Sequence, residues 1–248
     1  MEPRYPFYLY WGNAVYRHAY GLYRPLYWTY KRMSDRRLIR MLEHHLRPGM
    51  TALDVGANVG FYSDLISRLV GEKGAVHCFE PEPQNFERLR RAMKGRKNVV
   101  INPVAAAEKE GAVTLYLSGG LNIDHHTYDD GAGRKPVEVA CTSIDGYFKS
   151  GERVDLIKMD IQGAEYHALL GMRHTIRRSA NVTLFSEFWP YGLKKAGIDP
   201  EKYLNLIRSL GFSIRFSHSR HASEFSSKTG EHRFCSQIFC FRTGGKPS

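Results

Sequence analysis

Asp54-Val-Gly-Ala-Asn-Val-Gly60 sets the architecture of this chain. It follows the apolar run Thr51-Ala-Leu53 and leads into residues 61–69, which the pattern predicts to be a helix. A second apolar run, residues 75–79, is followed by Glu80, about 20 residues after the last glycine of the turn. A strand, a glycine turn, a helix and a strand that ends in an acid form half of a nucleoside-binding fold. The glycines let the backbone approach a ligand, and the acid accepts hydrogen bonds from ribose hydroxyls.

The turn departs from the dinucleotide pattern at two positions. A dinucleotide turn needs a middle glycine, so that the pyrophosphate can rest against bare backbone, and Asn58 stands there. Asp54 ends the first strand beside the turn, and its carboxylate would repel a pyrophosphate. S-adenosylmethionine carries a sulfonium, an ammonium and no phosphate, so the turn favours this methyl donor over NAD. The alternative interpretation is a tight turn that holds no ligand.

Composition limits the class of protein. The chain has 248 residues, enough for one α/β domain with a substantial core, and 42% of them are hydrophobic, which is typical of a globular protein. No run of about 18 uncharged apolar residues predicts a transmembrane helix. Arginines interrupt the first residues, so no signal peptide is expected. The cysteines contain no C-x-x-C pair and predict buried thiols in a reducing cytoplasm: Cys78, Cys141, Cys235 and Cys240.

Positive charge gathers at the two ends of the sequence. The net charge is +11, and residues 1–49 hold nine Lys or Arg against three Asp or Glu. Residues 202–248 hold eight against two, so the central region is nearly neutral. Such ends attract nucleic acid, an anionic membrane or a phosphorylated substrate. A solvated basic surface without a partner is the alternative.

The first 33 residues are rich in aromatic side chains with Arg and Lys between them. Five tyrosines recur at spacings of four and three, which predicts one face of a helix that Pro25 kinks or restarts: Tyr16, Tyr20, Tyr23, Tyr27 and Tyr30. The spacing favours docking of this stripe on the domain or on a second subunit, as in a homo-oligomer. Contact with a membrane interface and stacking on nucleic-acid bases remain open. We therefore divide the chain into a helical extension, 1–47, and one domain, 48–248.

The remaining chain alternates strands with helices, which predicts a mostly parallel sheet. Further strands are expected at 99–102, 154–159, 182–186, 212–216 and 235–241, and helices at 83–94, 164–178 and 200–210. No helix separates the last two strands, so the final strand is expected to be antiparallel. Two partly exposed strands, 113–117 and 137–141, flank a polar loop, 118–136, whose glycines permit motion.

Three segments together resemble the FkbM-type methyltransferases. They are Asp54-Val-Gly-Ala-Asn-Val-Gly60, Phe79-Glu-Pro-Glu-Pro83 and Lys158-Met-Asp-Ile-Gln-Gly-Ala-Glu165, and the resemblance covers about residues 45–216. It implies a class I methyltransferase fold, a Rossmann-like three-layer sandwich with a mostly parallel seven-stranded sheet. It also implies S-adenosylmethionine as donor and transfer to an oxygen, commonly a hydroxyl of a sugar or secondary metabolite. The acceptor itself does not carry over.

The cofactor half of the site is expected at the turn and the second strand. Gly56 and Gly60 shape the turn, Asn58 bonds the methionine portion or holds the turn, and Glu80 takes the ribose diol. Asp54 is expected to face the cationic end of the donor. The resemblance places Ala105 beside the adenine. The complete set of cofactor candidates is Asp54, Gly56, Ala57, Asn58, Gly60, Glu80, Pro81, Ala105 and Asp160.

The acceptor half is expected at the ends of the next two strands. Asp160 and Glu187 end neighbouring strands, and an alcohol needs a base to take its proton during methyl transfer. Asp160 is one candidate base, and His125, in the polar loop, is another. Alternatively, Asp160 and Glu187 hold a divalent cation together with Asp124 or a histidine. The structural interpretations are a contact of Asp160 with the donor's ammonium and an ion pair or helix cap at Glu187.

Three functions compete at this point. The first is an O-methyltransferase whose acceptor is a small molecule or a glycan, including a lipid-linked glycan at the inner face of a membrane. The second is an RNA or other nucleic-acid methyltransferase that uses the basic aromatic ends. Base methylation commonly uses an N-P-P-[YF]-like motif, and this chain has Asp160-Ile-Gln-Gly163 there, which disfavours nucleic acid. The third is a protein that binds S-adenosylmethionine without catalysis.

Overall fold

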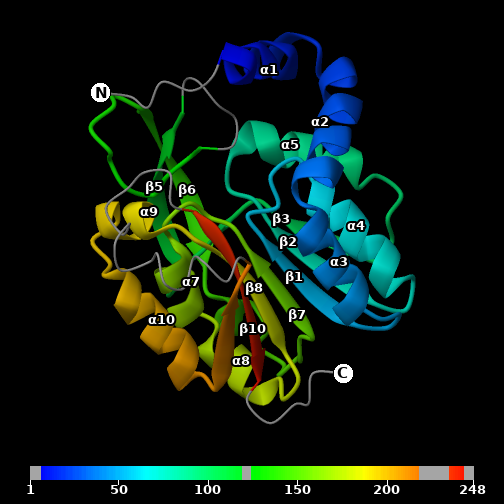
Figure 1. Ribbon diagram of the computed structural model, residues 1–248, viewed down its shortest axis with the longest axis vertical. Helices are drawn as coiled ribbons and strands as arrows, with labels where there is room; N and C mark the ends of the chain where they lie inside the picture. Colours follow the sequence, from blue (N-terminus) through cyan, green and yellow to red (C-terminus); the bar gives the residue numbers. More distant parts are fainter. Residues whose placement is uncertain (1–6, 119–123, 218–234, 243–248) are drawn as a thin grey trace.

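The structure is a computed structural model that describes residues 7–118, 124–217 and 235–242. Its centre is a seven-stranded sheet in the order β3-β2-β1-β7-β8-β10-β9 (Figure 1). The first five of these strands run parallel, and β10 pairs antiparallel with both β8 and β9, which confirms the predicted fold class. The strands are β1 (Thr51–Val55), β2 (Ala75–Phe79), β3 (Val99–Asn102), β7 (Leu156–Met159), β8 (Thr183–Phe188), β9 (Phe212–Phe216) and β10 (Ser236–Arg242).

Helices cover both faces of this sheet and make three layers (Figure 1). On one face, Leu42 and Ile66 are fully buried against strand residues such as Ala52, in a core shared by α3, α4 and α5. On the other face, Leu169 and Ile207 pack with β1, β7 and β8. The helices are α3 (Arg36–His45), α4 (Phe61–Val70), α5 (Pro83–Ala92), α6 (Ile144–Tyr147), α7 (Glu165–Leu170), α8 (Arg173–Arg178), α9 (Pro190–Lys195) and α10 (Pro200–Ser209).

A small second sheet stands beside the carboxyl ends of the parallel strands. It has the order β4-β6-β5, with β4 (Ala105–Ala106), β5 (Gly111–Leu117) and β6 (Lys135–Thr142). The two strands predicted around the polar loop are present as β5 and β6, and they form an antiparallel pair. Part of the loop between them, residues 119–123, lies outside the described chain, including two of the glycines on which predicted loop motion rests.

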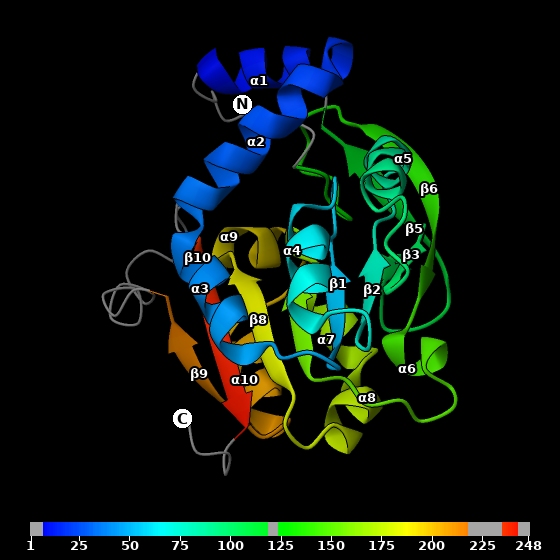
Figure 2. The same ribbon diagram turned by 90° about the vertical axis from the view of Figure 1, so that its right-hand side faces the viewer.

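The tyrosine stripe of the N-terminal extension docks on the domain. Tyr16 and Tyr23, from α1 (Phe7–His18) and α2 (Tyr20–Ser34), are buried in a cluster that includes Val59 from the glycine turn. The guanidinium of Arg88 on α5 lies 3.3 Å from the centre of the Tyr16 ring and donates to its carbonyl oxygen at 2.7 Å. Figure 2 shows α1 and α2 as an arm across one end of the sheet. Docking is therefore confirmed, while residues 1–6 of the predicted extension lie outside the described chain.

The predicted single helix over 164–178 is wrong, because the chain forms two short helices there, α7 and α8. Between them Gly171 lies against the second sheet, where an added Cβ would stand 1.9 Å from the carbonyl oxygen of Ala107. The carboxylate of Asp145 accepts from the backbone nitrogens of His174 and Thr175 at 3.0 and 2.7 Å. These bonds give α8 an N-terminus of its own.

In the described residues, no helix has the length and apolar character needed to cross a membrane.

Candidate active site

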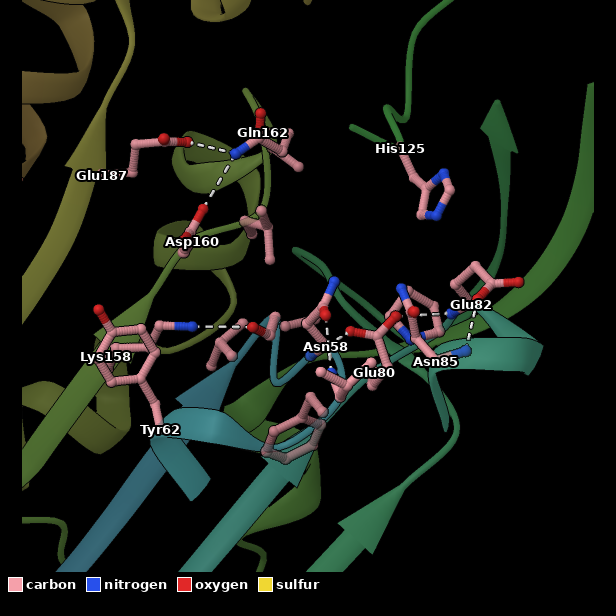
Figure 3. A pocket seen from close by; sticks show the side chains of 18 of the residues that line it. Asn58, Tyr62, Glu80, Glu82, Asn85, His125, Lys158, Asp160, Gln162 and Glu187 are labelled. Atoms are coloured by element: carbon pink, nitrogen blue, oxygen red, sulfur yellow. Dashed lines mark hydrogen bonds between the residues drawn. The ribbon is translucent and has the colours of Figure 1, made fainter. Parts of the chain in front are cut away.

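A cavity of about 320 Å³ lies at the carboxyl ends of β1, β2, β7 and β8 (Figure 3). Its volume is in the range of sites that hold ligands of cofactor size. An open α/β sheet binds its ligand at this edge, so the location matches the prediction. The cavity is bounded by the glycine turn, by β4 and β5 of the second sheet, and by the inner face of α2. The predicted residues that line it are Gly56, Asn58, Glu80, Pro81, Ala105, His125, Asp160 and Glu187.

The glycine turn has the geometry that its sequence predicted. Gly56 has a φ of 78°, and an added Cβ would stand 2.0 Å from the carbonyl oxygen of Asp160, so only glycine fits. Asn58 is also left-handed, with a φ of 50°, and its side-chain oxygen accepts from the nitrogen of Val59 at 2.8 Å. Gly60 precedes the first residue of α4 with a φ of 91°. Ala57 is buried behind the turn, and its nitrogen donates to the carbonyl oxygen of Phe79.

Glu80 is held rigidly at the cavity wall. Its two carboxylate oxygens accept from the backbone nitrogens of Asn58, at 2.7 Å, and Glu82, at 3.0 Å. Burial raises the pKa of Glu80 to about 7, against the opposing effect of these two hydrogen bonds. Glu82 in turn caps α5 by accepting from the nitrogens of Gln84 and Asn85. The backbone of the turn and the start of α5 therefore orient one carboxylate toward the cavity (Figure 3).

Asp54 lies in the sheet rather than at the cavity, contrary to the expectation that it faces the cationic end of the donor. Its side chain is fully buried and does not line the cavity. One oxygen accepts from the hydroxyl of Ser63 at 2.6 Å, and the other lies 3.0 Å from the ammonium of Lys158, its register partner on β7. Burial lowers the pKa of Lys158, but the carboxylates of Asp54 and Asp160 outweigh it and raise that pKa overall. Asp54 therefore neutralises a buried lysine.

Two acids meet on the opposite wall of the cavity, as predicted. The amide of Gln162 donates to Asp160 at 3.0 Å and to Glu187 at 2.8 Å, and so bridges them. The thiol of Cys235 lies 3.0 Å from the other oxygen of Glu187. Burial, followed by the negative charge of Asp160, raises the pKa of Glu187 well above its usual value. Of the two acids, Glu187 is therefore the one whose protonated form the surroundings favour.

The loop between β7 and α7 that carries Asp160 is fixed by a buried acid. Glu165, 1% exposed, accepts from the backbone nitrogens of Ile161 at 3.0 Å and Gly163 at 2.9 Å. Burial raises the pKa of Glu165 to about 7, although these bonds oppose the rise. Gln162, between the residues that supply these two nitrogens, has a φ of 54°. A residue other than glycine adopts this backbone conformation only when its surroundings require it. Glu165 is thus a structural anchor for the loop that follows Asp160.

His125 lines the cavity on the far side from Asp160 and Glu187 (Figure 3). Its Nδ1 accepts from the nitrogen of Ser118 at 3.1 Å, and burial lowers its pKa, which favours the neutral ring. Asp124, the predicted third ligand of a cation, instead pairs with Arg134 at 2.8 Å and His126 at 2.7 Å. Within the described ranges, no three His, Cys, Asp or Glu side chains gather in a way that can hold a metal ion.

Several lining residues were not anticipated from the sequence. Lys158 interrupts an otherwise apolar core strand, and a charge in such a strand signals a buried partner. Gln162 lies in the motif that carries Asp160, but its sequence position does not indicate that it bridges Asp160 and Glu187. The bridge depends on the left-handed backbone at Gln162. The arm supplies three more lining residues, for which the sequence holds no signal: Tyr27, Lys31 and Asp35.

The family model described as "Methyltransferase FkbM domain" matches residues 54–214, well over half of the chain. The chain belongs to the FkbM methyltransferase family. As a member of it, the protein is an S-adenosylmethionine-dependent methyltransferase, which confirms the resemblance seen in its three segments. The matched span contains the glycine turn, Glu80, and the strand ends that carry Asp160 and Glu187.

Two curated relatives are methyltransferases that act on oxygen according to their names. The 2-O-methyltransferase NoeI of Sinorhizobium fredii is 25% identical over 216 residues, covering 80% of this chain and 85% of that protein. The 31-O-demethyl-FK506 methyltransferase FkbM of Streptomyces tacrolimicus is 33% identical over 115 residues, 45% of this chain and 42% of that protein.

Solved structures show the same fold. A putative rRNA-methylase from Clostridium thermocellum has a TM-score of 0.56 and 10% identity, covering 86% of this chain and 97% of that one. A putative methyltransferase from Streptococcus mutans, in complex with SAH, has a TM-score of 0.51 and 12% identity, covering 83% and 95%. At these identities the likeness concerns the fold alone.

Proposed function

We propose that this FkbM-family methyltransferase transfers a methyl group to a hydroxyl of a sugar, glycan or secondary metabolite. The proposal rests on one observation: a single cavity has Glu80 on one wall and the Asp160–Glu187 pair on the opposite wall. The first wall suits a nucleoside, and the second provides a base for an alcohol. The names of the two relatives, which specify transfer to oxygen, support this assignment.

The residues present fit S-adenosylmethionine better than a dinucleotide. Even without Glu187, whose pKa is raised, the cavity is lined by more acids than bases, which suits a cationic ligand and repels a pyrophosphate: Asp35, Glu80, Glu82 and Asp160 against Lys31 and Lys158. Because Gly56 lacks a side chain, the glycine turn can lie directly against the backbone of Asp160, which brings the two walls together. We assign the ribose hydroxyls to Glu80 and the adenine to the surface beside Ala105 and Leu115. When bound, the donor supplies a methyl carbon already activated by the sulfonium.

The chain itself must take the proton of the acceptor hydroxyl. We assign this task to Asp160, because burial and the nearby carboxylate of Asp160 raise the pKa of Glu187 well above its usual value, which makes Glu187 the poorer proton acceptor of the pair at neutral pH. Gln162 holds Oδ1 of Asp160, so Oδ2 is the atom that we assign to the proton. An alcohol has a high pKa, so the proton leaves during the attack, and general base catalysis of this kind contributes about 10²–10⁴-fold to the rate.

The test is transfer of labelled methyl groups from S-adenosylmethionine to a panel of hydroxyl compounds, with a metal chelator present. We expect Asp160→Asn to lower kcat by about 10²–10⁴-fold. Glu187→Gln, which keeps a neutral hydrogen-bonding group, should lower kcat by less than about tenfold. Donor affinity, measured separately, shows whether Asp160 instead holds the donor's ammonium.

Three results would argue against this assignment. One is equal loss of activity in the two variants, and another is an Asp160→Asn variant that transfers methyl groups normally. If the wild type loses all activity when the chelator is present and recovers it when magnesium is added, the alternative in which the two acids hold a cation is favoured. If RNA accepts methyl groups in preference to every hydroxyl compound of the panel, the acceptor class is wrong.

A further inference from the structure

The outer face of α2 exposes large apolar side chains. Leu22, Leu26, Tyr30 and Met33, here called the outer α2 surface, are 58% to 62% exposed. Among the large hydrophobic side chains that the structure describes, the next most exposed is Val100, at 45%. Of the tyrosine stripe seen in the sequence, Tyr30 belongs to this surface, whereas Tyr16 and Tyr23 are buried against the domain. Scattered exposed leucines are ordinary, but a concentration on one helix indicates a contact.

A basic groove lies beside this surface, between α2–α3 and α4. Four arginines line it, Arg32, Arg36, Arg40 and Arg68, here called the arginine groove, and Trp28, Ile39 and Leu65 add apolar lining. Two acids line it as well, and one of them, Asp64, already pairs with Arg68 at 2.9 Å and with Arg96. In the described part of the chain, the ion pairs do not include Arg32, Arg36 or Arg40.

We propose that the outer α2 surface and the arginine groove bind the surface of an anionic phospholipid membrane. A helix that presents leucine and methionine beside a row of arginines matches both parts of a lipid surface, the acyl boundary and the phosphate headgroups. The positive charge of the N-terminal segment agrees with an anionic partner, because residues 1–49 carry nine basic side chains against three acidic ones. Each Lys or Arg close to an anionic leaflet strengthens binding, and the effect is lost at high salt.

Two other occupants fit the surface less well. In a twofold dimer the same patch faces itself, which would bring the uncompensated arginines of both copies together. RNA would pair with the arginines but would leave Leu22, Leu26 and Met33 without an apolar partner. An anionic membrane satisfies both halves of the surface at once.

The two faces of α2 connect this surface to the cavity. Tyr27 and Lys31 on the inner face line the cavity, while Leu26 and Met33 on the outer face are exposed. Membrane binding would therefore hold the cavity beside the lipid headgroups, where an acceptor attached to a lipid is presented. This last step rests on the proposed function, whereas the binding itself does not.

Vesicle flotation of the full chain, without donor or acceptor, tests the proposal. The vesicles are phosphatidylcholine alone, and phosphatidylcholine mixed with an equal part of phosphatidylglycerol. We expect the protein to bind the mixed vesicles and to dissociate at high salt. Two triple variants, Leu22→Ser with Leu26→Ser and Met33→Ser, and Arg32→Gln with Arg36→Gln and Arg40→Gln, should each weaken binding at least about tenfold.

A matched control removes three exposed charges, two from the segment between α6 and β7 and one from α8: Lys149→Gln with Arg153→Gln and Arg177→Gln. Figure 2 shows α6 and α8 at the end of the sheet opposite to α1. This variant should bind vesicles as the wild type does, and thermal unfolding and donor titration confirm that every variant is folded. Equal loss in the control would overturn the proposal, as would wild-type protein that does not float with mixed vesicles. A dimer in solution that the leucine variant converts to monomers, or RNA binding that outcompetes the vesicles, would also overturn it.

Discussion

Gly56 joins the donor wall and the acceptor wall of the cavity. Its bare Cα faces the backbone of Asp160, and its left-handed φ turns the chain from β1 toward α4. A side chain there would push β1 and β7 apart at the very edge that holds the two acids. One residue thus controls the shape of the turn and the position of the proposed base.

We expect Gly56→Ala to destabilise the protein more than a glycine substitution that introduces backbone strain alone. Gly95 provides the match, because its φ is 85° and an added Cβ would meet nothing within 4 Å. Gly95→Ala should cost about 1–2 kcal/mol of unfolding free energy. Gly56→Ala should cost at least about 2 kcal/mol more, because its Cβ also collides with backbone. Urea unfolding measures the free energy of unfolding of both variants. Similar losses in the two would mean that β1 and β7 can move apart at this edge at little cost, contrary to the prediction.

The residue scale also shows what a sequence can predict. Glu80, Asp160 and Glu187 were predicted from their places at strand ends, and the structure puts all three at one cavity. The direction of a side chain is not contained in such a pattern. Asp54 lies one residue before the end of β1, where it faces Lys158 across the strand register, and only the pairing of β1 with β7 reveals that partner.

At the scale of elements, the loop from β7 to α7 depends on Glu165. The buried carboxyl accepts from two backbone nitrogens of the loop and so fixes the loop that follows Asp160. The pKa of Glu165 is raised to about 7, so between its usual value and pH 7 the folded protein keeps a proton that the unfolded chain releases. Through this window the contribution of Glu165 to stability therefore falls as pH rises.

Comparing Glu165→Gln with the wild type isolates this contribution. The glutamine cannot titrate, so the free energy of unfolding of the variant should fall less steeply with pH between about 5 and 7. The difference in slope should approach about 1.4 kcal/mol per pH unit, the value for one proton. Equilibrium unfolding at several pH values measures it, and parallel curves would show that Glu165 is ionised in the folded protein.

Secondary structure was predicted well wherever the apolar pattern alone determines it. All seven strands of the main sheet and its antiparallel end follow from runs such as residues 75–79 and 182–186. The break between α7 and α8 was missed, because it depends on contacts that are distant in sequence. The approach of Gly171 to Ala107 and the capping of α8 by Asp145 both cross from one part of the chain to another.

At the scale of the whole molecule, each of the two faces of the N-terminal arm has its own role. Its inner tyrosines dock on α5 and on the turn, and Tyr27 and Lys31 complete the cavity. Its outer face carries the apolar and basic groups for which we propose a membrane partner. The sequence predicted the docking from the tyrosine spacing, whereas the cavity-lining role of the arm required the folded molecule.

Calorimetric titration with S-adenosylmethionine, with NAD as the competing ligand, is the most direct test of the assigned donor site. Glu80→Ala removes the proposed ribose contact, and Glu87→Ala, on the outer side of α5, is the matched control. We predict micromolar binding of S-adenosylmethionine by the wild type and by Glu87→Ala, loss of that binding in Glu80→Ala, and no comparable binding of NAD. Unchanged affinity in Glu80→Ala, or a preference for NAD, would contradict the account.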